Sequence, residues 1–179
     1  MVDFETLNQL AKDCGFTTSR PLDISKLNFL QEVRDMCAAN TCHNFDKSWS
    51  CPPACPSLEE MREKIKAYST GIIVQTVGEL EDNLDWDAMQ EAGVKQQESF
   101  QKMWAVLKND YPNLFPMGAG GCRICETCTY PDNPCRFPEL LSYSMEACGL
   151  VISQVCTDNA IPYNYGPNAI SYTGCFLLE

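Results

Sequence analysis

Apolar residues recur along the chain with two different periods, one typical of helices and one typical of strands. Phe4, Leu7 and Leu10 share one helical face before Gly15, which is a helix end signal. The run 71–77 is rich in β-branched residues and has the length of a buried strand. On this basis helices are predicted over residues 3–13, 57–68, 82–110, 138–145 and 150–159, and extended segments over 16–24, 71–77, 114–117 and 169–178.

The order of these elements indicates an α/β or α+β fold, with a small mixed sheet and flanking helices. The helix predicted at 82–110 is long enough to cross over between the strands 71–77 and 114–117, which we therefore expect to be parallel. The length corresponds to about one typical domain, so we expect residues 1–179 to form a single domain. Apolar side chains available for the buried face of the long helix are Trp86, Met89, Val94, Phe100, Trp104 and Leu107.

Two segments, 33–56 and 118–138, lack these periods and have the composition of loops. Each holds four of the 12 cysteines in the chain. The N-terminus, Met1 to Thr6, is acidic and lacks the basic and apolar stretches of a signal peptide, so we expect a cytoplasmic protein. In a reducing compartment clustered cysteines are more often metal ligands than disulfides, and a chain of this length does not need several disulfides for stability.

The chain is acidic, with a formal net charge of −11. This charge repels phosphate backbones and anionic lipid, so we expect no nucleic-acid partner and no membrane-surface binding. No run of about 18 apolar residues is present, so no membrane span is predicted. The acidic run from Glu79 to Asp87 is typical of a solvated helix start, with a cation site or a docking surface as the alternatives.

The second loop contains Cys122-x2-Cys125-x2-Cys128-x6-Cys135. Two-residue spacings let one tight loop direct three thiolates at one inorganic core, while a more distant fourth cysteine closes the site, as in 4Fe-4S ferredoxins. Zinc ribbons use separated Cys-x2-Cys pairs, so zinc fits this spacing less well and stays an alternative. The glycines of the preceding segment 118–121 leave room for backbone N–H groups to approach the cluster sulfurs.

The first loop contains Cys37-x4-Cys42-x8-Cys51-x3-Cys55, a looser spacing that matches no established motif. Four thiols within so short a polar loop need a partner in a reducing cell, so these four are predicted to ligate a second metal centre. His43 is interpreted as a loop imidazole, with metal ligation as the alternative.

Arginines accompany both groups of cysteines. Arg34, Arg123 and Arg136 either offset the negative charge of a thiolate-ligated cluster or are solvent-exposed. The remaining cysteines are predicted to be small core residues, although two of them, Cys148 and Cys156, follow the second loop closely enough to supply a substitute thiolate. The four are Cys14, Cys148, Cys156 and Cys175.

At these cysteines the sequence resembles an uncharacterised family of cysteine-rich predicted metal-binding proteins, a domain of unknown function common in anaerobic bacteria and archaea. The resemblance covers nearly the whole chain and implies a bound metal, but it implies no particular reaction. The stretches that carry it are Val33-Arg-x2-Cys37-x4-Cys42-x6-Trp49-Ser-Cys51-Pro-Pro53, Cys122-Arg-Ile-Cys125-x2-Cys128, Pro134-Cys135-Arg136, Ser144-Met-Glu-Ala-x-Gly149 and Tyr172-Thr-Gly-Cys-Phe-Leu-Leu178.

Three functions fit these observations. The first is low-potential electron transfer by two 4Fe-4S clusters, with the acidic surface docking a basic redox enzyme. The second is an enzyme in which one cluster keeps an open iron site for a small molecule, which requires an incomplete set of thiolates. The third is a structural zinc protein, which would be colourless and redox-silent. We favour the first hypothesis.

Overall fold

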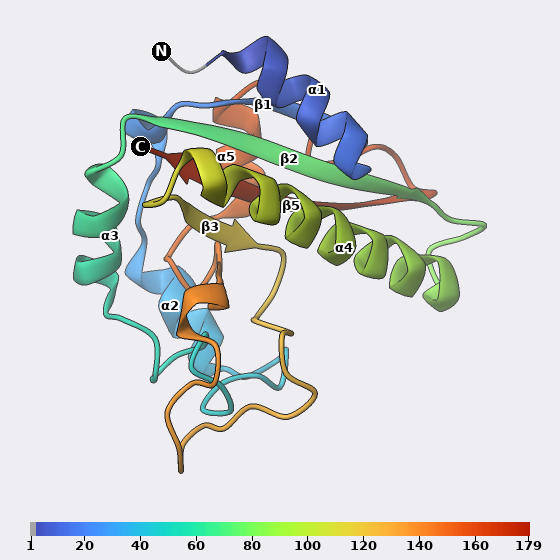
Figure 1. Cartoon of the computed structure of the whole chain (residues 1–179). Helices are drawn as coiled ribbons and strands as arrows, with labels where there is room; N and C mark the ends of the chain where they lie inside the picture. The colour runs from blue at the N-terminus through green and yellow to red at the C-terminus, as the bar shows by residue number, and fades with distance from the viewer. Residues whose placement is uncertain (1–2) are drawn as a thin grey trace.

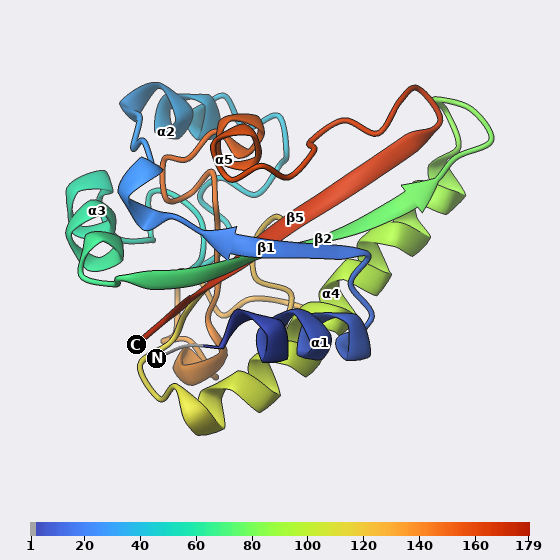
Figure 2. The same cartoon turned by 90° about the horizontal axis from the view of Figure 1, so that it is seen from above.

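The computed structural model describes residues 3–179, which form a five-stranded sheet with helices on both faces (Figures 1 and 2). The α-helices of this part of the chain are α1 (Phe4–Cys14), α2 (Gln31–Ala38), α3 (Leu58–Lys66), α4 (Trp86–Asp110) and α5 (Ile152–Asp158), with 3₁₀ turns η1 (Ile24–Lys26) and η2 (Pro138–Leu140). The strands are β1 (Thr18–Leu22), β2 (Thr70–Glu79), β3 (Phe115–Gly118), β4 (Tyr143–Ser144) and β5 (Ala169–Leu178). The predicted mixed α/β architecture is thus confirmed.

The strand order is β1-β2-β5-β3-β4. β5 pairs antiparallel with both β2 and β3, so β2 and β3 run in the same direction, as the crossover at α4 predicted. The two strands are not neighbours, because the C-terminal strand β5 inserts between them and pairs with β2 along ten residues. Within the described part of the chain, β3 and β4 form the one parallel pair.

The sheet separates two apolar clusters, and alternate residues of β5 enter each of them. Cys175 and Leu177 point into the cluster shared with α3 and α5, whereas Phe176 and Leu178 point into the cluster shared with α1 and α4. This alternation follows from the two-residue period of a strand that is covered on both faces. The structure is therefore a three-layer arrangement in which β5 supplies the centre of both cores.

α4 lies on the same face as α1 and packs against β2 and β5 (Figure 2). Phe100 of α4 stacks on Phe176, with ring centroids 4.4 Å apart. The predicted burial of Trp86 and Val94 was wrong, since they are 67% and 53% exposed. The buried face instead includes small and polar residues that an apolar pattern misses; it consists of Ala92, Gln96, Ser99, Phe100, Met103, Trp104 and Leu107.

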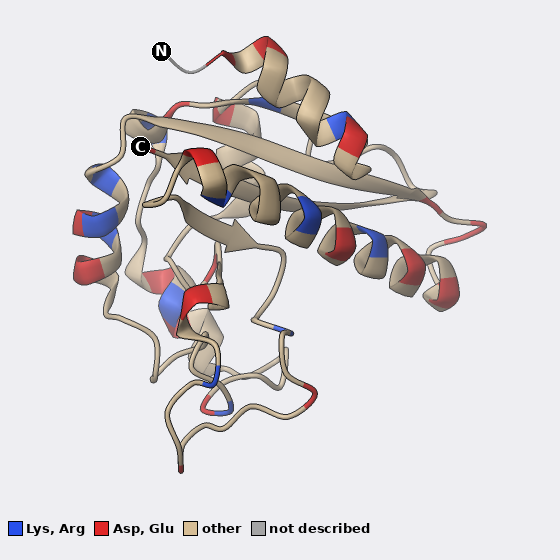
Figure 3. Cartoon of the chain, in the orientation of Figure 1, with Lys and Arg blue, Asp and Glu red and all other residues tan. Residues whose placement is uncertain are grey.

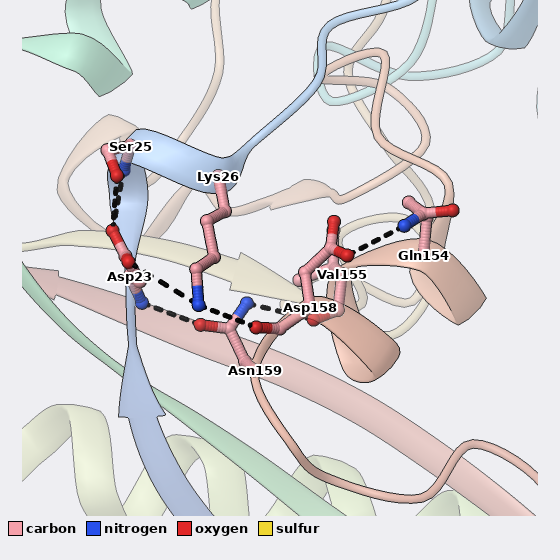
Figure 4. Close-up of polar contacts among 7 residues, drawn as sticks. All are labelled: Asp23, Ser25, Lys26, Gln154, Val155, Asp158 and Asn159. Atoms are coloured by element: carbon pink, nitrogen blue, oxygen red, sulfur yellow. Dashed lines mark hydrogen bonds and ion pairs between the residues drawn. The ribbon is translucent and has the colours of Figure 1, made fainter.

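The opposite face is covered by α3, which starts at the capping box of Ser57 and Glu60, and by α5. Polar contacts fasten the end of α5 to the segment after β1 (Figure 4). The side-chain oxygen of Asn159 accepts a hydrogen bond from the Asp23 N–H at 2.7 Å, and Lys26 Nζ donates to the Asp158 carbonyl at 3.0 Å. These contacts hold α5 over the core that surrounds Cys156.

Both cysteine-rich segments lie below β3 in Figure 1. The predicted loop 33–56 was partly wrong, because its first residues belong to α2 and Cys37 therefore lies on a helix. The helix predicted over 138–145 was also wrong, since Pro138 opens only the 3₁₀ turn η2 before β4. No helix within residues 3–179 is long and apolar enough to cross a membrane.

Candidate metal centres

The four cysteines of the second loop line one cavity, which we call the second cavity. They are Cys122, Cys125, Cys128 and Cys135, and all four are partly buried free thiols. The cavity is narrow, about 30 Å³, and part of its wall comes from Ser48, Trp49 and Ser50 of the first loop. The four thiols with closely spaced positions in the sequence thus lie around one cavity. The contribution of the first loop to this cavity was not predicted.

Hydrogen bonds within the second loop fix its course around these thiols. Arg136 Nη1 donates to the Thr127 carbonyl at 2.8 Å, and Thr129 Oγ1 donates to the Pro134 carbonyl at 2.8 Å. Burial raises the pKa of the Cys122 thiol, while hydrogen bonds from the backbone of Ile124 and Ser142 act in the opposite direction. Such backbone donors favour the thiolate, the form that ligates a metal.

The first loop gathers only three of its four cysteines around a common space, which we call the first cavity. Cys37, Cys42 and Cys51 line it, and its volume is about 360 Å³. Burial raises the pKa of the Cys37 thiol, the nearby Glu146 carboxylate raises it further, and the Arg34 guanidinium lowers it. Three thiols and one carboxylate thus share this environment.

Cys55 does not share the space that the other three cysteines of the first loop line, although its thiol lies close enough to Cys51 for the two to interact electrostatically. It is 4% exposed, belongs to the apolar cluster under β5, and is absent from the lining of the first cavity. Burial raises the pKa of its thiol, and Arg34 lowers it. Arg34 Nη1 also donates to the carbonyls of Pro56 at 3.0 Å and Ala147 at 2.6 Å, so it fastens α2 to two neighbouring segments.

The two cavities are adjacent because the loops contact each other. Ser50 Oγ accepts a hydrogen bond from the Cys122 N–H at 3.0 Å, and Ser50 is fully buried. A Cβ on Gly121 would lie 3.3 Å from Cys51 Sγ, so a side chain at this position would displace the sulfur. Trp49 packs edge-on against Tyr130 with ring centroids 5.0 Å apart, and its Nε1 donates to the Asn133 carbonyl.

Glu146 reaches the first cavity from a turn more than a hundred residues away in sequence from Cys42. Ser144 Oγ accepts from the Ala147 N–H at 3.0 Å, and Gly149 ends the turn with φ +81°. A Cβ on Gly149 would also meet Leu58 Cδ1 at 2.3 Å, so only glycine fits. The stretch Ser144 to Gly149, noted in the sequence without a structural reason, thus forms a tight turn that presents Glu146.

The other cysteines line neither cavity. Cys148, Cys156 and Cys175 are at most 1% exposed in the core, and Cys14 is buried against α4, so the prediction that they are core residues is confirmed. No substitute ligand comes from Cys148 or Cys156 in this arrangement, since neither lines a cavity. His43 is exposed and also lies outside both cavity linings.

A third cavity lies between α4 and the segment 118–121, and Ile124 lines both this cavity and the second one. Gln96 lines it, is 2% exposed, and has both side-chain polar atoms without a hydrogen-bond partner among residues 3–179. A buried carboxamide that lacks both partners is uncommon, because burial without hydrogen bonds costs free energy.

Charges are distributed unevenly around these sites (Figure 3). Acidic residues gather at the N-terminal end of α4 and in the loop before it. There, Asp85 accepts from the Ala88 N–H and Asp82 from the Leu84 N–H. These contacts agree with the interpretation of this run as a helix start.

The chemistry of the two cavities fits metal binding. Each presents several cysteine thiols, which are soft ligands suited to iron–sulfur clusters and zinc. Within residues 3–179, no three His, Cys, Asp or Glu side chains already stand in the geometry of a bound metal ion. Binding would therefore turn thiols that already share a cavity toward a common centre.

Comparison with known families agrees with this chemistry. The family model described as "Predicted metal-binding protein (DUF2284)" matches residues 20–178. The matched span includes both groups of cysteines and the turn that carries Glu146, and it confirms the resemblance noted from the sequence. No curated protein and no solved structure matches the chain.

Proposed function

The chain belongs to this family of predicted metal-binding proteins, and on that premise we propose that it is an iron–sulfur protein that holds two clusters and transfers electrons. One 4Fe-4S cluster would be held by Cys122, Cys125, Cys128 and Cys135. The other would lie in the first cavity, with Cys37, Cys42 and Cys51 among its ligands.

One observation carries this proposal: all four thiols of the spacing typical of 4Fe-4S ligation line a single cavity. The first loop supplies part of that cavity wall, and Ser50 joins the two loops next to Cys122. Two adjacent centres are the arrangement that lets an electron move from one cluster to the other. Structural zinc remains the alternative for the metal, since thiolates also suit zinc.

In electron transfer no bond forms or breaks in a partner molecule. A reduced donor gives one electron to a cluster, and the cluster passes that electron to an oxidised redox protein. The net charge of −11 favours a partner with a basic docking surface, through long-range attraction that weakens as salt is added.

Anaerobic purification followed by chemical reduction tests this proposal. We expect a brown protein with broad absorption near ~400 nm that bleaches on reduction and recovers on reoxidation. Cys125→Ser should remove about half of the iron, because Cys125 belongs to one of two clusters. Cys14→Ser serves as the control, since Cys14 lies outside both cavities and should leave the iron content unchanged. A colourless wild-type protein with stoichiometric zinc would contradict the proposal.

The third cavity favours a second candidate function, chemistry on a small molecule next to the second cluster. The observation behind it is the unpartnered carboxamide of Gln96, which offers one donor and one acceptor to a ligand. Acetamide presents the complementary pair and is a suitable probe. A saturable change in the NMR signal of the Gln96 side-chain amide would support this candidate, and no change at high probe concentration would count against it.

A further inference from the structure

The first cavity contains a carboxylate, that of Glu146, in addition to the thiols that were expected there. The Oε2 atom of Glu146 is buried and has no hydrogen-bond partner among residues 3–179. Glu146 takes no part in the ion pairs of that part of the chain, which are Lys26 with Asp23 and Arg62 with Glu59. Arg34, which lowers the pKa of the neighbouring Cys37 thiol, directs its Nη1 to backbone carbonyls and forms no ion pair with Glu146 within residues 3–179.

Glu146 as a whole is half-buried, but its enclosed Oε2 has no donor beside it in the described part of the chain, and such an unpartnered oxygen is uncommon in a folded protein. Glu146 lines the same cavity as Cys37, Cys42 and Cys51, and it influences the Cys37 thiol electrostatically. A metal centre bound by these three thiolates would supply the positive charge that Glu146 lacks. A four-ligand centre needs one donor more than these three thiols, and Glu146 is a further metal-binding side chain in the cavity lining.

Cys55, the residue that the sequence suggests for this role, is directed elsewhere. Its side chain belongs to the apolar cluster, which also contains Cys148 and Met61. The hydrogen bond from the Cys55 N–H to the Cys51 carbonyl, 3.1 Å long, closes a turn between the two residues. To reach the first cavity, Cys55 would have to leave a packed core, whereas Glu146 already lines the cavity.

We propose that Glu146, and not Cys55, provides the fourth ligand of the cluster in the first cavity, which then has three thiolates and one carboxylate. The inference rests on the proposed iron–sulfur function and assigns one ligand within it. A carboxylate carries the same charge as the thiolate it replaces, so the total ligand charge is unchanged. It is a harder ligand than sulfur, so the iron that it holds is the one released or exchanged most readily.

Mild oxidation makes this difference measurable. Ferricyanide removes one further electron from a 4Fe-4S cluster that is already in its oxidised state. The cluster then releases one Fe²⁺ and becomes a 3Fe-4S cluster, which is detected by EPR. We expect wild-type protein to yield about one 3Fe-4S cluster per chain, from the first cavity, while the four-thiolate cluster of the second loop stays intact.

Four variants of the full chain separate the two candidate ligands. Glu146→Gln should release the iron about tenfold faster, because a neutral amide replaces the carboxylate. Glu146→Cys should suppress the release by supplying a fourth thiolate. Cys55→Ala should match the wild type in iron content and in 3Fe-4S yield. Glu63→Gln is the control, since Glu63 is an exposed glutamate on α3.

The outcomes also distinguish this inference from the proposed function. If Cys55→Ala loses the iron of one cluster while Glu146→Gln behaves as the wild type, the ligand assignment is overturned and the two-cluster function stands. If Cys55→Ala fails to fold, the pair Glu146→Gln and Glu146→Cys still decides, since equal release rates in both variants and the wild type would refute the role of Glu146. A wild-type protein that contains no iron overturns both.

Discussion

Ser50 forms one of the contacts that join the two cysteine loops, and replacing it by alanine tests that contact. Its hydroxyl is fully buried and accepts the Cys122 N–H at 3.0 Å. It also lies 3.0 Å from Ser48 Oγ. In Ser50→Ala the backbone N–H of Cys122 loses this hydrogen bond, while the alanine methyl group occupies the same space.

The expected loss of unfolding free energy follows from the fact that an unpartnered buried donor destabilises a protein by more than an average hydrogen bond stabilises it. A buried donor left without a partner costs about 1–3 kcal/mol, and Cys122 is only partly buried, so we expect about 1–2 kcal/mol. For a chain of this size, each 1 kcal/mol shifts the midpoint of thermal unfolding by about 2–4 °C, so Ser50→Ala should lower it by about 2–8 °C.

Thermal unfolding of the anaerobically purified protein, followed by circular dichroism, measures this shift. Release of iron to a chelator should also be faster in Ser50→Ala, because Cys122 is less firmly held. Ser69→Ala is the control, since Ser69 is exposed and forms no side-chain hydrogen bond within residues 3–179. Unfolding midpoints of the two variants that agree within about 1 °C would refute the role assigned to Ser50.

Three further predictions concern stability and thiol chemistry. Burial raises the pKa of the Cys148 and Cys175 thiols in the folded protein. Their stabilising contribution is therefore complete below about pH 8.5, the ordinary thiol pKa of the unfolded chain, and is lost above it. In alkaline titrations the free energy of unfolding should fall by up to about 1.4 kcal/mol per pH unit for each thiol. Gly149→Ala should destabilise the protein by at least about 1 kcal/mol in denaturant titrations, because of the positive φ and the contact with Leu58; an unchanged midpoint would contradict this. In metal-free protein, iodoacetamide should label the exposed Cys42 first and leave Cys148 and Cys175 unlabelled, as peptide mass spectrometry can establish.

The gathering of the four thiols of the second loop was predictable from the sequence because their spacing is local. Cys122, Cys125 and Cys128 lie within seven residues, so any tight turn brings them together, and Cys135 follows in the same loop. The strands were predictable for a similar reason. The β-branched run in β2 and the apolar run in β5 are buried on both faces, and such strands read as continuous apolar segments.

The first site depends on contacts that no local pattern contains. Cys37 lies on α2, Cys42 and Cys51 lie in the following loop, and Glu146 comes from a turn after β4. The clustering of cysteines in the sequence includes Cys55 in this group, yet Cys55 follows a turn that begins at Cys51 and belongs to the apolar core. A cavity lining that is assembled from distant segments follows from tertiary packing, which the sequence pattern does not encode.

Packing between segments that are distant in sequence is also the reason why β5 was not expected between β2 and β3. The crossover helix α4 correctly predicted that β2 and β3 run in the same direction. The space between them is filled by a strand that arrives at the end of the chain, and its pairing with β2 is set by side chains on both faces. Connection lengths alone do not identify such an insertion.

The measurement that tests the central claim most directly is a count of iron and acid-labile sulfide in the anaerobic wild-type protein, combined with EPR of the reduced form. Two 4Fe-4S clusters predict about eight irons and about eight sulfides per chain, with signal splitting from two interacting paramagnets in adjacent cavities. About four irons per chain would leave only the second loop occupied. Zinc without sulfide and without a paramagnetic signal would contradict the account.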